Sequence, residues 1–183
     1  MCIRDRDNNI IWIGTDDGNV QLSKDAGKTW TKLNDKITGL PPFAFISNID
    51  ADNFNKGAAY ITVDAHRNGE MKPYLFYTND YGNTWQNLVN ETIKGYCHVV
   101  KQDLVNENLL FLGTEFGLFV SIDKGANWAQ FKSKIPQVGI FDMVIHPRDH
   151  DLILATHGRG VIIIDDITPV SYTHLTLPTS DLV

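Results

Sequence analysis

Three short segments of the chain each place a hydroxyl, a carboxylate and an indole at the same spacing. They are SKDAGKTW (23–30), TNDYGNTW (78–85) and SIDKGANW (121–128), which share the pattern hydroxyl–x–Asp–x–Gly–x–x–Trp. A carboxylate in a polar turn suggests acid–base catalysis or the binding of a hard cation such as calcium. A catalytic acid is not needed once per repeat, and calcium requires a cluster of oxygen ligands. We therefore expect these three segments, called the Asp turns, to serve the fold.

Each residue type of an Asp turn suits a tight hairpin. The Asp accepts hydrogen bonds from backbone N–H groups of its own turn, and the preceding hydroxyl adds another. The Gly takes a positive φ, and the Trp covers the hairpin and fills space between repeats. The residues to which we assign this structural role are Ser23, Asp25, Gly27, Trp30, Thr78, Asp80, Gly82, Trp85, Ser121, Asp123, Gly125 and Trp128.

Histidines and paired carboxylates near the C-terminus suggest other chemistry. His146 and His150 fall in one expected turn, whereas His157 follows the next expected strand, at its far end. Metal ligands must converge on one point, so we predict no metal site, and no residue pattern indicates a cofactor. The pair Asp165–Asp166 could do acid–base work, or it ends a strand where an Asp turn would otherwise begin.

The Asp turns belong to a longer repeat. NIIWIGTDDGNVQLSKDAGKTWTKL aligns with NLLFLGTEFGLFVSIDKGANWAQF, and DLILATHGRGVIIIDDI repeats the first half. Val, Ile, Phe, Tyr and Trp gather in short runs separated by Gly, Asn, Asp and Pro, which predicts strands, and no segment keeps a helical period. Each unit of about 45 residues then holds four strands, A to D, with the Asp turn between C and D.

Four-stranded units at this period predict an all-β fold, the β-propeller. The chain would supply strands B–C–D of one blade, two whole blades, and strands A–B–C of a last blade. Blade boundaries are expected near residues 38, 93 and 136. Closed propellers have about four to eight blades, so about three and a half blades indicate a fragment of a larger ring.

The repeat occupies residues 7–169, and the two ends of the chain differ from it. MCIRDR (1–6) and VSYTHLTLPTSDLV (170–183) match nothing in the repeat and resemble translated sequencing-adaptor read-through in metagenomic reading frames. We expect both segments to lie outside the fold. We also expect the natural protein to be longer at both ends and to contain the remaining blades.

Composition narrows the possible partners. The net charge of -6 argues against nucleic acid. No apolar run approaches the roughly 18 residues of a membrane helix. Two cysteines make no disulfide framework, and Cys97 lies in an apolar run, as expected of a small core residue.

The Asp turns resemble the Asp-box, or bacterial neuraminidase repeat, of sialidases, xyloglucanase-type glycoside hydrolases and sortilin-type propellers. The Gly-Thr–x–x–Gly lead-in and the segment HPRDHDLILATHGRGVIIIDDITP (146–169) are similar to the sortilin-type and xyloglucanase-like exported bacterial group. The resemblance implies a propeller from a secreted, periplasmic or cell-surface protein. The arginine triad of sialidases has no counterpart, because Arg67, Arg148 and Arg159 stand in no matching motif.

The loops between strands B and C are the expected functional loops. With strand A at the axis, D–A connections and B–C loops share one face, and A–B turns and Asp turns share the other. The B–C loops TDDGN, AHRNGEMK, TEFG and THGRG vary in size and charge, as functional loops on a rigid scaffold do. The candidate ligand-binding residues are Asp16, Asp17, His66, Arg67, Glu115, Phe116, His157 and Arg159.

Two functions remain open. The first is a binding or assembly module that recognises a peptide or a glycan on the face of the B–C loops. The second is a glycoside hydrolase, which needs two carboxylates roughly 5–10 Å apart in a cleft. Glu115 with Asp16 or Asp17 is the candidate pair, and Phe116 is either a platform for sugar or a packed loop residue. Aromatic rings beside the pair would favour the hydrolase, and scattered charges would favour the binding module.

Overall fold

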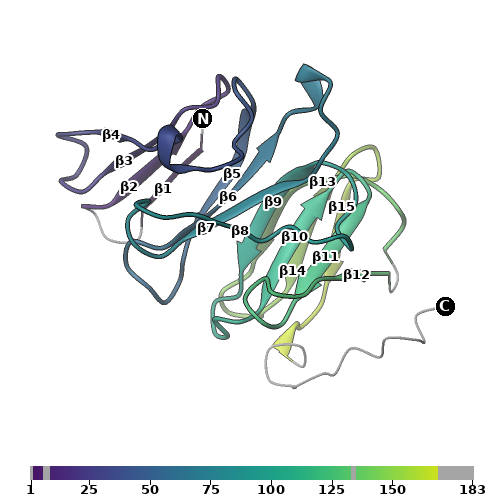
Figure 1. Cartoon of the computed structure of the whole chain (residues 1–183). Helices are drawn as coiled ribbons and strands as arrows, with labels where there is room; N and C mark the ends of the chain where they lie inside the picture. Colours follow the sequence, from purple (N-terminus) through teal and green to yellow (C-terminus); the bar gives the residue numbers. More distant parts are fainter. Residues whose placement is uncertain (1, 6–8, 133–134, 169–183) are drawn as a thin grey trace.

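The structure, a computed structural model, describes residues 2–5, 9–132 and 135–168. It contains four antiparallel sheets, each built from strands consecutive in the chain (Figure 1). The first sheet comprises β1 (Cys2–Asp5), β2 (Ile11–Gly14), β3 (Val20–Ser23) and β4 (Thr31–Lys32). The second comprises β5 (Phe45–Ala51), β6 (Ala59–Asp64), β7 (Tyr74–Thr78) and β8 (Gln86–Asn87).

The last two sheets follow the same plan. The third sheet comprises β9 (Cys97–Gln102), β10 (Leu110–Thr114), β11 (Gly117–Ser121) and β12 (Ala129–Phe131). The fourth comprises β13 (Ile140–Ile145), β14 (Leu152–Thr156) and β15 (Val161–Ile164). Two short 3-10 helices, η1 (Asn34–Lys36) and η2 (His66–Asn68), lie in the connections. The all-β fold predicted from the sequence is confirmed.

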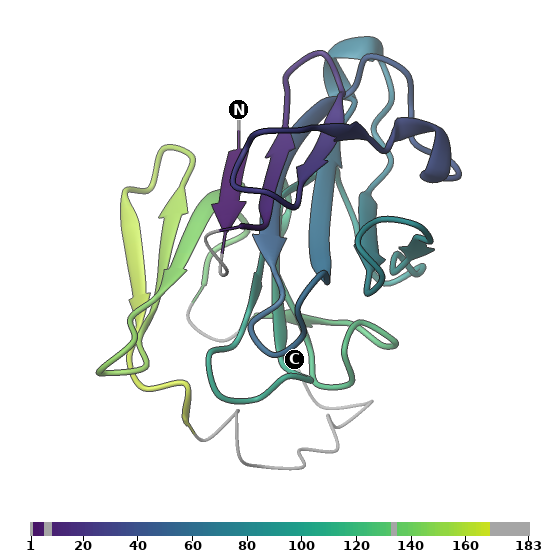
Figure 2. The same cartoon turned by 90° about the vertical axis from the view of Figure 1, so that its left-hand side faces the viewer.

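The sheets are arranged as consecutive propeller blades. The first strand of each sheet lies beside the first strand of the next, since β1 contacts β5, β5 contacts β9, and β9 contacts β13. Figure 1 shows the first sheet, the second sheet and then the last two sheets in chain order across the molecule, and Figure 2, turned by 90°, shows the fourth sheet standing apart at the left. The first strands therefore lie nearest the common axis, and the short fourth strands form the rim.

The first sheet differs from its expected form. Residues 2–5, which match nothing in the repeat and were expected to lie outside the fold, form β1 and pair with β2 from Cys2–Gly14 to Asp5–Ile11. The sheet therefore has four strands, not three. The physical reason is that an unpaired edge of β2 presents free N–H and C=O groups, which any extended segment can satisfy. The fourth sheet has the three strands expected.

Each hydrophobic core lies between two neighbouring sheets. The first joins Trp12 and Leu22 of the first sheet to Ile46 and Phe76 of the second. A second core lies between the second and third sheets, and a third core between the third and fourth. The core side chains are almost fully buried. A blade is thus stabilised mainly by the blades on either side of it, as in other repeat folds.

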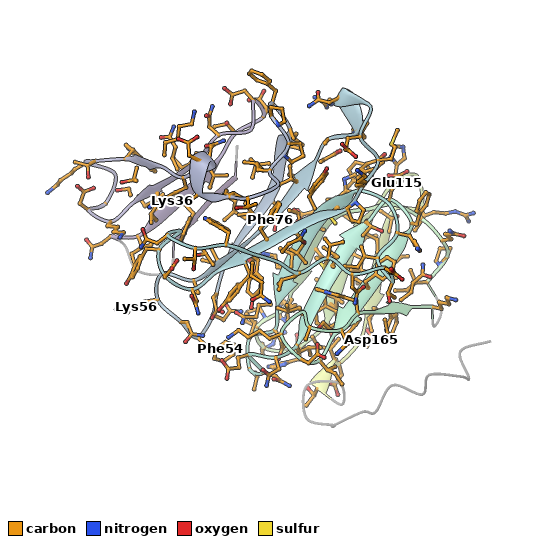
Figure 3. All side chains as sticks on the ribbon, in the orientation of Figure 1. Lys36, Phe54, Lys56, Phe76, Glu115 and Asp165 are labelled. Atoms are coloured by element: carbon orange, nitrogen blue, oxygen red, sulfur yellow. The ribbon has the colours of Figure 1, made fainter. Side chains whose placement is uncertain are left out.

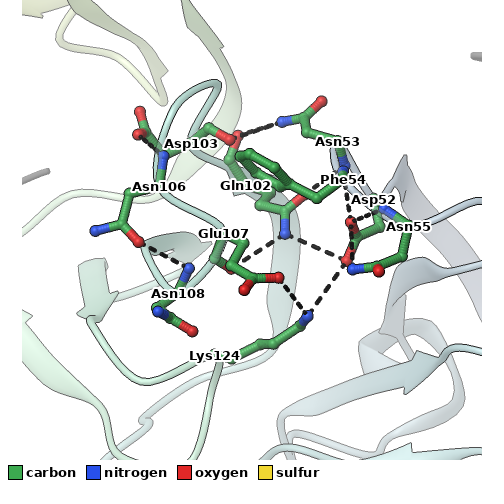
Figure 4. A network of polar contacts seen from close by, with 10 residues as sticks. All are labelled: Asp52, Asn53, Phe54, Asn55, Gln102, Asp103, Asn106, Glu107, Asn108 and Lys124. Carbon is green, nitrogen blue, oxygen red and sulfur yellow. Dashed lines mark hydrogen bonds and ion pairs between the residues drawn. The ribbon is translucent and has the colours of Figure 1, made fainter.

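Polar contacts also join the second and third blades (Figure 4). Lys101 Nζ lies 2.6 Å from Asp50 Oδ1, and both side chains are buried. Gln102 Nε2 donates to Asp52 Oδ2 at 3.2 Å, and Lys124 Nζ lies 3.9 Å from the same oxygen. A buried ion pair adds little net stability but penalises any other register. These contacts fix the relative position of the two blades.

Candidate functional site

The Asp turns carry the hydrogen bonds expected within each turn. Thr29 donates to Asp25 from its backbone nitrogen at 2.8 Å and from its hydroxyl at 2.7 Å. The Ser23 hydroxyl donates to the same carboxylate and accepts from the Gly27 nitrogen, both at 2.8 Å. The second and third Asp turns repeat these contacts. These carboxylates are therefore occupied by their own turns.

The same bonds hold the three carboxylates ionised. The backbone N–H of Thr29, with the Thr29 hydroxyl, lowers the pKa of Asp25 to about 2. The backbone N–H of Thr84 lowers the pKa of Asp80. Partial burial opposes ionisation of Asp123, but hydrogen bonds from Asn127 outweigh it, so the pKa of Asp123 is also lowered. A hydrogen-bonded carboxylate of this kind is a poor general acid.

A second residue of each Asp turn has a left-handed backbone, which the sequence did not reveal. The three glycines have φ of 76–90°, as expected, and the residue before each has φ of 58–61°. The N–H of this preceding residue donates to a carbonyl of the A–B turn in the same blade. These pairs are Ala26–Asn9, Tyr81–Gly57 and Lys124–Asn108, at 2.8–3.0 Å. The A–B turns and the Asp turns thus lie on one face.

The B–C loops lie on the opposite face, with the connections between blades. The hydrogen bonds are Ile46 N to Thr15 O, Glu115 N to Tyr96 O, and His157 N to Gly139 O, at 2.9–3.2 Å. Figure 3 shows Glu115, in a B–C loop, at one end of the molecule, and Phe54 and Lys56, in an A–B turn, at the other. We call these the B–C face and the Asp-turn face.

A row of rings crosses three blades on the B–C face. His66 stacks on Tyr96 with ring centroids 4.7 Å apart, and Tyr96 meets His98 edge-on at 5.0 Å. His98 in turn stacks on Phe141 at 4.0 Å, and Phe141 meets His157 edge-on at 5.2 Å. The structure thus brings together His66 and His157, two of the candidate residues, through three residues that were not candidates.

Two carboxylates are paired with histidines of this row. Asp64 is buried and lies 2.6 Å from His66 Nδ1. Glu115 Oε2 lies 3.2 Å from His98 Nε2 and packs so closely on Gly139 that a Cβ there would be 3.0 Å away. Burial, together with the Glu115 charge, raises the pKa of Tyr96. The row therefore combines ring edges with acceptor oxygens, and the carboxylates hold the imidazoles in position.

The central rings of the row come from a β-bulge repeated in three blades. Ser47 in β5, His98 in β9 and Phe141 in β13 are each skipped in the pairing with the neighbouring strand. A bulge turns one side chain out of the regular alternation. Ser47 Oγ donates to Cys97 O at 3.0 Å, and His98 stacks on Phe141, so the bulged residues of β5 and β9 each contact the next sheet.

Other candidate residues lie in the B–C loops without joining the row. Asp17 accepts hydrogen bonds from Thr15 and Asn19, and the Thr15 hydroxyl, the larger cause, lowers the pKa of Asp17. Phe116 is half-exposed and lies against Gly95. Asp16, Arg67 and Arg159 are also exposed in these loops.

The C-terminal histidines occupy two ends of one blade. His150 N donates to His146 O at 3.0 Å within the A–B turn, whereas His157 follows β14 on the B–C face. Asp166 has φ of 47° and accepts from Thr168 N at 3.1 Å. Ile167 N also donates to His150 O, so the Asp165–Asp166 segment returns to the A–B turn as an Asp turn does.

A cavity of about 590 Å³ lies on the Asp-turn face, away from the row of rings. It is lined by Trp12, by Asn9 and Ile10, and by the A–B turn of the second blade, residues 51–58. Phe54 and Lys56 belong to this turn and lie far from Glu115 in Figure 3. No residue that lines this cavity was a candidate from the sequence.

Comparison with known proteins agrees with this architecture. The family model described as "Sortilin, neurotensin receptor 3" (Sortilin-Vps10) matches residues 73–175, more than half of the chain. No curated protein matches the sequence. No helix among the described residues is long and apolar enough to cross a membrane.

Solved structures show the same fold at low sequence identity. The GH74 xyloglucanase from Xanthomonas campestris is 16% identical, with a TM-score of 0.68 over 87% of this chain and 28% of the enzyme. YCF48 bound to D1 peptide is 14% identical, with a TM-score of 0.56 over 90% of this chain and 64% of YCF48. The extracellular domain of a one-component system from B. thetaiotaomicron is 15% identical, with a TM-score of 0.65 over 91% and 21%. This chain spans less than two thirds of each.

Proposed function

The chain belongs to the Sortilin-Vps10 family, and from this premise we propose that it is a propeller-type binding module that recognises a peptide or a glycan on its B–C face. The parent protein would be an exported bacterial protein, and the module would hold a ligand or an assembly partner outside the cytoplasm. The structural likeness to an extracellular domain from B. thetaiotaomicron supports this location. The Asp turns, similar to the Asp-box, would stabilise the blades.

One observation carries the proposal, the row of rings from His66 to His157 on the B–C face. Side chains from three blades meet there, and Phe141 keeps 47% of its surface exposed. Exposed aromatic side chains beside hydrogen-bonding groups are typical of recognition surfaces. The carboxylates of the Asp turns, by contrast, already accept hydrogen bonds within their own turns.

The packing of the row favours a peptide over a glycan. His66 and Tyr96 are stacked with an interplanar angle of 22°, as are His98 and Phe141. Stacking covers one face of each of these rings, and His98 is only 6% exposed, so the row offers a sugar less open ring face than a set of unstacked rings would. The edges of the imidazoles remain next to the carboxylates of Asp64 and Glu115. Such edges suit the N–H and C=O groups of an extended peptide.

The same groups support binding more than hydrolysis. A glycoside hydrolase needs one carboxylate free to protonate the leaving group and a second to attack or activate water. Asp64 is buried against His66, and Glu115 is paired with His98. Asp17 is held in its own turn, two blades away from Glu115. The pairing of Glu115 with Asp16 or Asp17 has no contact to support it.

A binding screen with matched variants tests the proposal. The full chain would be screened against peptide and oligosaccharide arrays, and the best ligand would be titrated into Glu115→Gln and Glu107→Gln. Glu107 lies in the A–B turn of the same blade, on the Asp-turn face, so it controls for loss of charge. We expect Glu115→Gln to weaken binding about tenfold, the size of a charged hydrogen bond, and Glu107→Gln to leave it unchanged.

Three outcomes decide between the alternatives. Binding to oligosaccharides alone would replace the peptide by a glycan as the ligand. Release of reducing sugar from a polysaccharide, abolished by Glu115→Gln, would establish the hydrolase instead. Equal losses for the two Glu variants would remove the B–C face from the proposal.

A further inference from the structure

Phe43 is a strained and exposed aromatic residue in the connection between the first and second sheets. Its φ is 55°, in the left-handed region that a residue with a Cβ rarely adopts, and 80% of its surface is exposed. The other described non-glycine residues with a positive φ all lie on the Asp-turn face, in the Asp turns, in an A–B turn or in the segment that returns to it. Phe43 is therefore the one such residue that the structure describes on the B–C face.

The backbone at Phe43 is held from both neighbouring blades. Asn68, in the B–C loop of the second sheet, donates from Nδ2 to the carbonyls of Pro42 at 3.3 Å and of Phe43 at 3.2 Å. In the B–C loop of the first sheet, Gly18 approaches so closely that a Cβ there would lie 2.8 Å from Ala44 O. A strained residue persists only where its surroundings fix it, and strained residues gather at sites that bind ligands. The two loops thus fix the backbone from which this ring projects.

The exposure of Phe43 does not come from a missing blade. Leu40 and Ala44, on either side of it in the chain, pack in the core between the first and second sheets, and the structure describes both of these sheets. Neighbouring blades cover one another through the faces of their sheets, as the three cores show. Phe43 lies instead at the end of the sheets, among the connections and the B–C loops. Blades added at either end of the chain would lie beside it and not over it.

The immediate neighbours of the ring offer a ligand few hydrogen-bond donors. Pro41 and Pro42 precede Phe43 and have no backbone N–H, and the Asn68 amide already donates to the carbonyls of Pro42 and Phe43. A sugar carries hydroxyls that need hydrogen-bonding partners when they are buried, whereas an apolar side chain needs only the surface of the ring. The surroundings of Phe43 therefore suit an apolar side chain.

One short helix links Phe43 to the row of rings. His66 and Asn68 are the first and last residues of η2, so the loop that holds Phe43 also carries the first ring of the row. We propose that Phe43 is a ligand anchor that receives an apolar side chain of the peptide lying along the row of rings. The inference rests on the peptide-binding function proposed above and adds to it a determinant of specificity. An aromatic ring on a fixed backbone loses little conformational entropy on binding, which suits an anchor.

Selection on the full chain from a phage-displayed library of linear peptides supplies the probe, and the tightest peptide would be titrated into variants. We expect Phe43→Ala to weaken its binding about thirtyfold, as the loss of an aromatic anchor does. Phe54→Ala is the matched control and should leave the affinity unchanged, because Phe54 is 44% exposed in an A–B turn on the Asp-turn face (Figure 3). An alanine scan of the peptide should find one apolar residue whose removal weakens binding to the wild type but not to Phe43→Ala.

A glycine variant separates the role of the ring in binding from its effect on the fold. Glycine adopts a positive φ without strain, so Phe43→Gly should raise the melting temperature by about 1–3 °C. It should weaken peptide binding as much as Phe43→Ala does. A lowered melting temperature would mean that the ring stabilises the fold, and the inference would be wrong.

The outcomes distinguish this inference from the function on which it rests. If Glu115→Gln weakened peptide binding and Phe43→Ala did not, the inference would fail and the proposed function would stand. If the library gave no peptide, both would fail. Binding of oligosaccharides alone, lost in Phe43→Ala, would make the ring a platform for sugar and would also overturn the inference.

Discussion

The Asp turns and the B–C loops close the same blades at opposite ends, and they differ in how closely they repeat. In the Asp turns the same hydroxyl, carboxylate and glycine make the same hydrogen bonds three times. In the B–C loops, the four sequences share little beyond a Thr or Ala at the start and a Gly within. The comparison teaches that packing between blades demands repetition, whereas the B–C face is free to vary.

Even within the repeated motif, the tryptophans differ in their surroundings. This difference should give the largest change in the free energy of unfolding among these predictions. Trp128→Ala should destabilise the chain by about 3–5 kcal/mol, because it removes a buried ring and its hydrogen bond to the preceding blade. Trp30→Ala should cost about 1 kcal/mol or less, because Trp30 is 40% exposed. Urea unfolding of the two variants measures both losses of stability. Equal costs would mean that the indole stabilises its own turn and not the interface between blades.

Replacing Arg159, in the B–C loop of the fourth blade, should weaken ligand binding without lowering stability. Arg159→Ala should weaken peptide binding about tenfold, the loss of one hydrogen bond to a charged group, while the melting temperature barely moves because the side chain is exposed. Arg148→Ala is the matched control, since Arg148 lies in the A–B turn of the same blade and bonds its neighbour Asp149 at 2.8–2.9 Å. Isothermal titration and thermal melting of both variants distinguish them. A similar loss of binding for Arg148→Ala would remove the distinction between the two faces.

Asp80 should affect stability and leave binding unchanged. Asp80→Ala removes hydrogen bonds to the backbone and hydroxyl of Thr84. We expect a loss of about 0.5–2 kcal/mol in the free energy of unfolding, as for other capping carboxylates. Asp16→Ala, which removes an exposed carboxylate from the B–C face, should leave stability within about 0.5 kcal/mol. If Asp80→Ala abolished ligand binding in a folded protein, the Asp turns would have a functional role.

Lowering the pH should protonate the carboxylates of all three Asp turns and so lower the stability of the fold. Asp25 has its pKa lowered from 3.8 to about 2, and the pKa values of Asp80 and Asp123 are lowered as well. Because the folded-state values lie below the unfolded ones, the stabilisation is complete above about pH 4–5 and is lost as the pH falls toward about 2. Urea unfolding of the wild type should therefore lose stability across this range. A triple Asp→Asn variant of the three turns should show a smaller loss, and an equal loss would assign the acid response to other carboxylates.

The repeated parts of the molecule were predictable from the sequence because several aligned copies show the same pattern of residues. The order of strands, the Asp turns and the division into two faces all follow from aligned segments and from the alternation of apolar residues. The strand β1 was not predictable, because residues 2–5 match no other copy of the repeat. Its pairing depends on the open edge of β2, which is a property of the folded sheet.

The contacts in the central part of the row of rings could not be predicted from the sequence either. Tyr96, His98 and Phe141 lie at the starts of two aligned segments, YCHVVKQD and IFDMVIHP. Their side chains meet because of bulges at His98 and Phe141, and a bulge changes which face a residue takes without altering the apolar pattern nearby. The available signal was that both segments place an aromatic or imidazole ring near the start of strand A. Glu115, His66 and His157 were predictable as loop residues. The rings that they contact could be identified only once the pairing register of the strands was known.

The smallest effect concerns the left-handed residue before each turn glycine. Ala26 has φ of 58°, a conformation that costs an alanine about 1–2 kcal/mol and a glycine almost nothing. Ala26→Gly should therefore stabilise the chain by about 0.5 kcal/mol, since the relieved strain exceeds the extra backbone entropy of the unfolded glycine. Ala126→Gly is the same change in the third Asp turn, at a residue whose φ is not positive, and it should destabilise by a similar amount. Opposite shifts in the urea midpoint would show that the turn backbone, and not the side chain, sets the residue at this position. Shifts of the same sign would place the strain elsewhere in the turn.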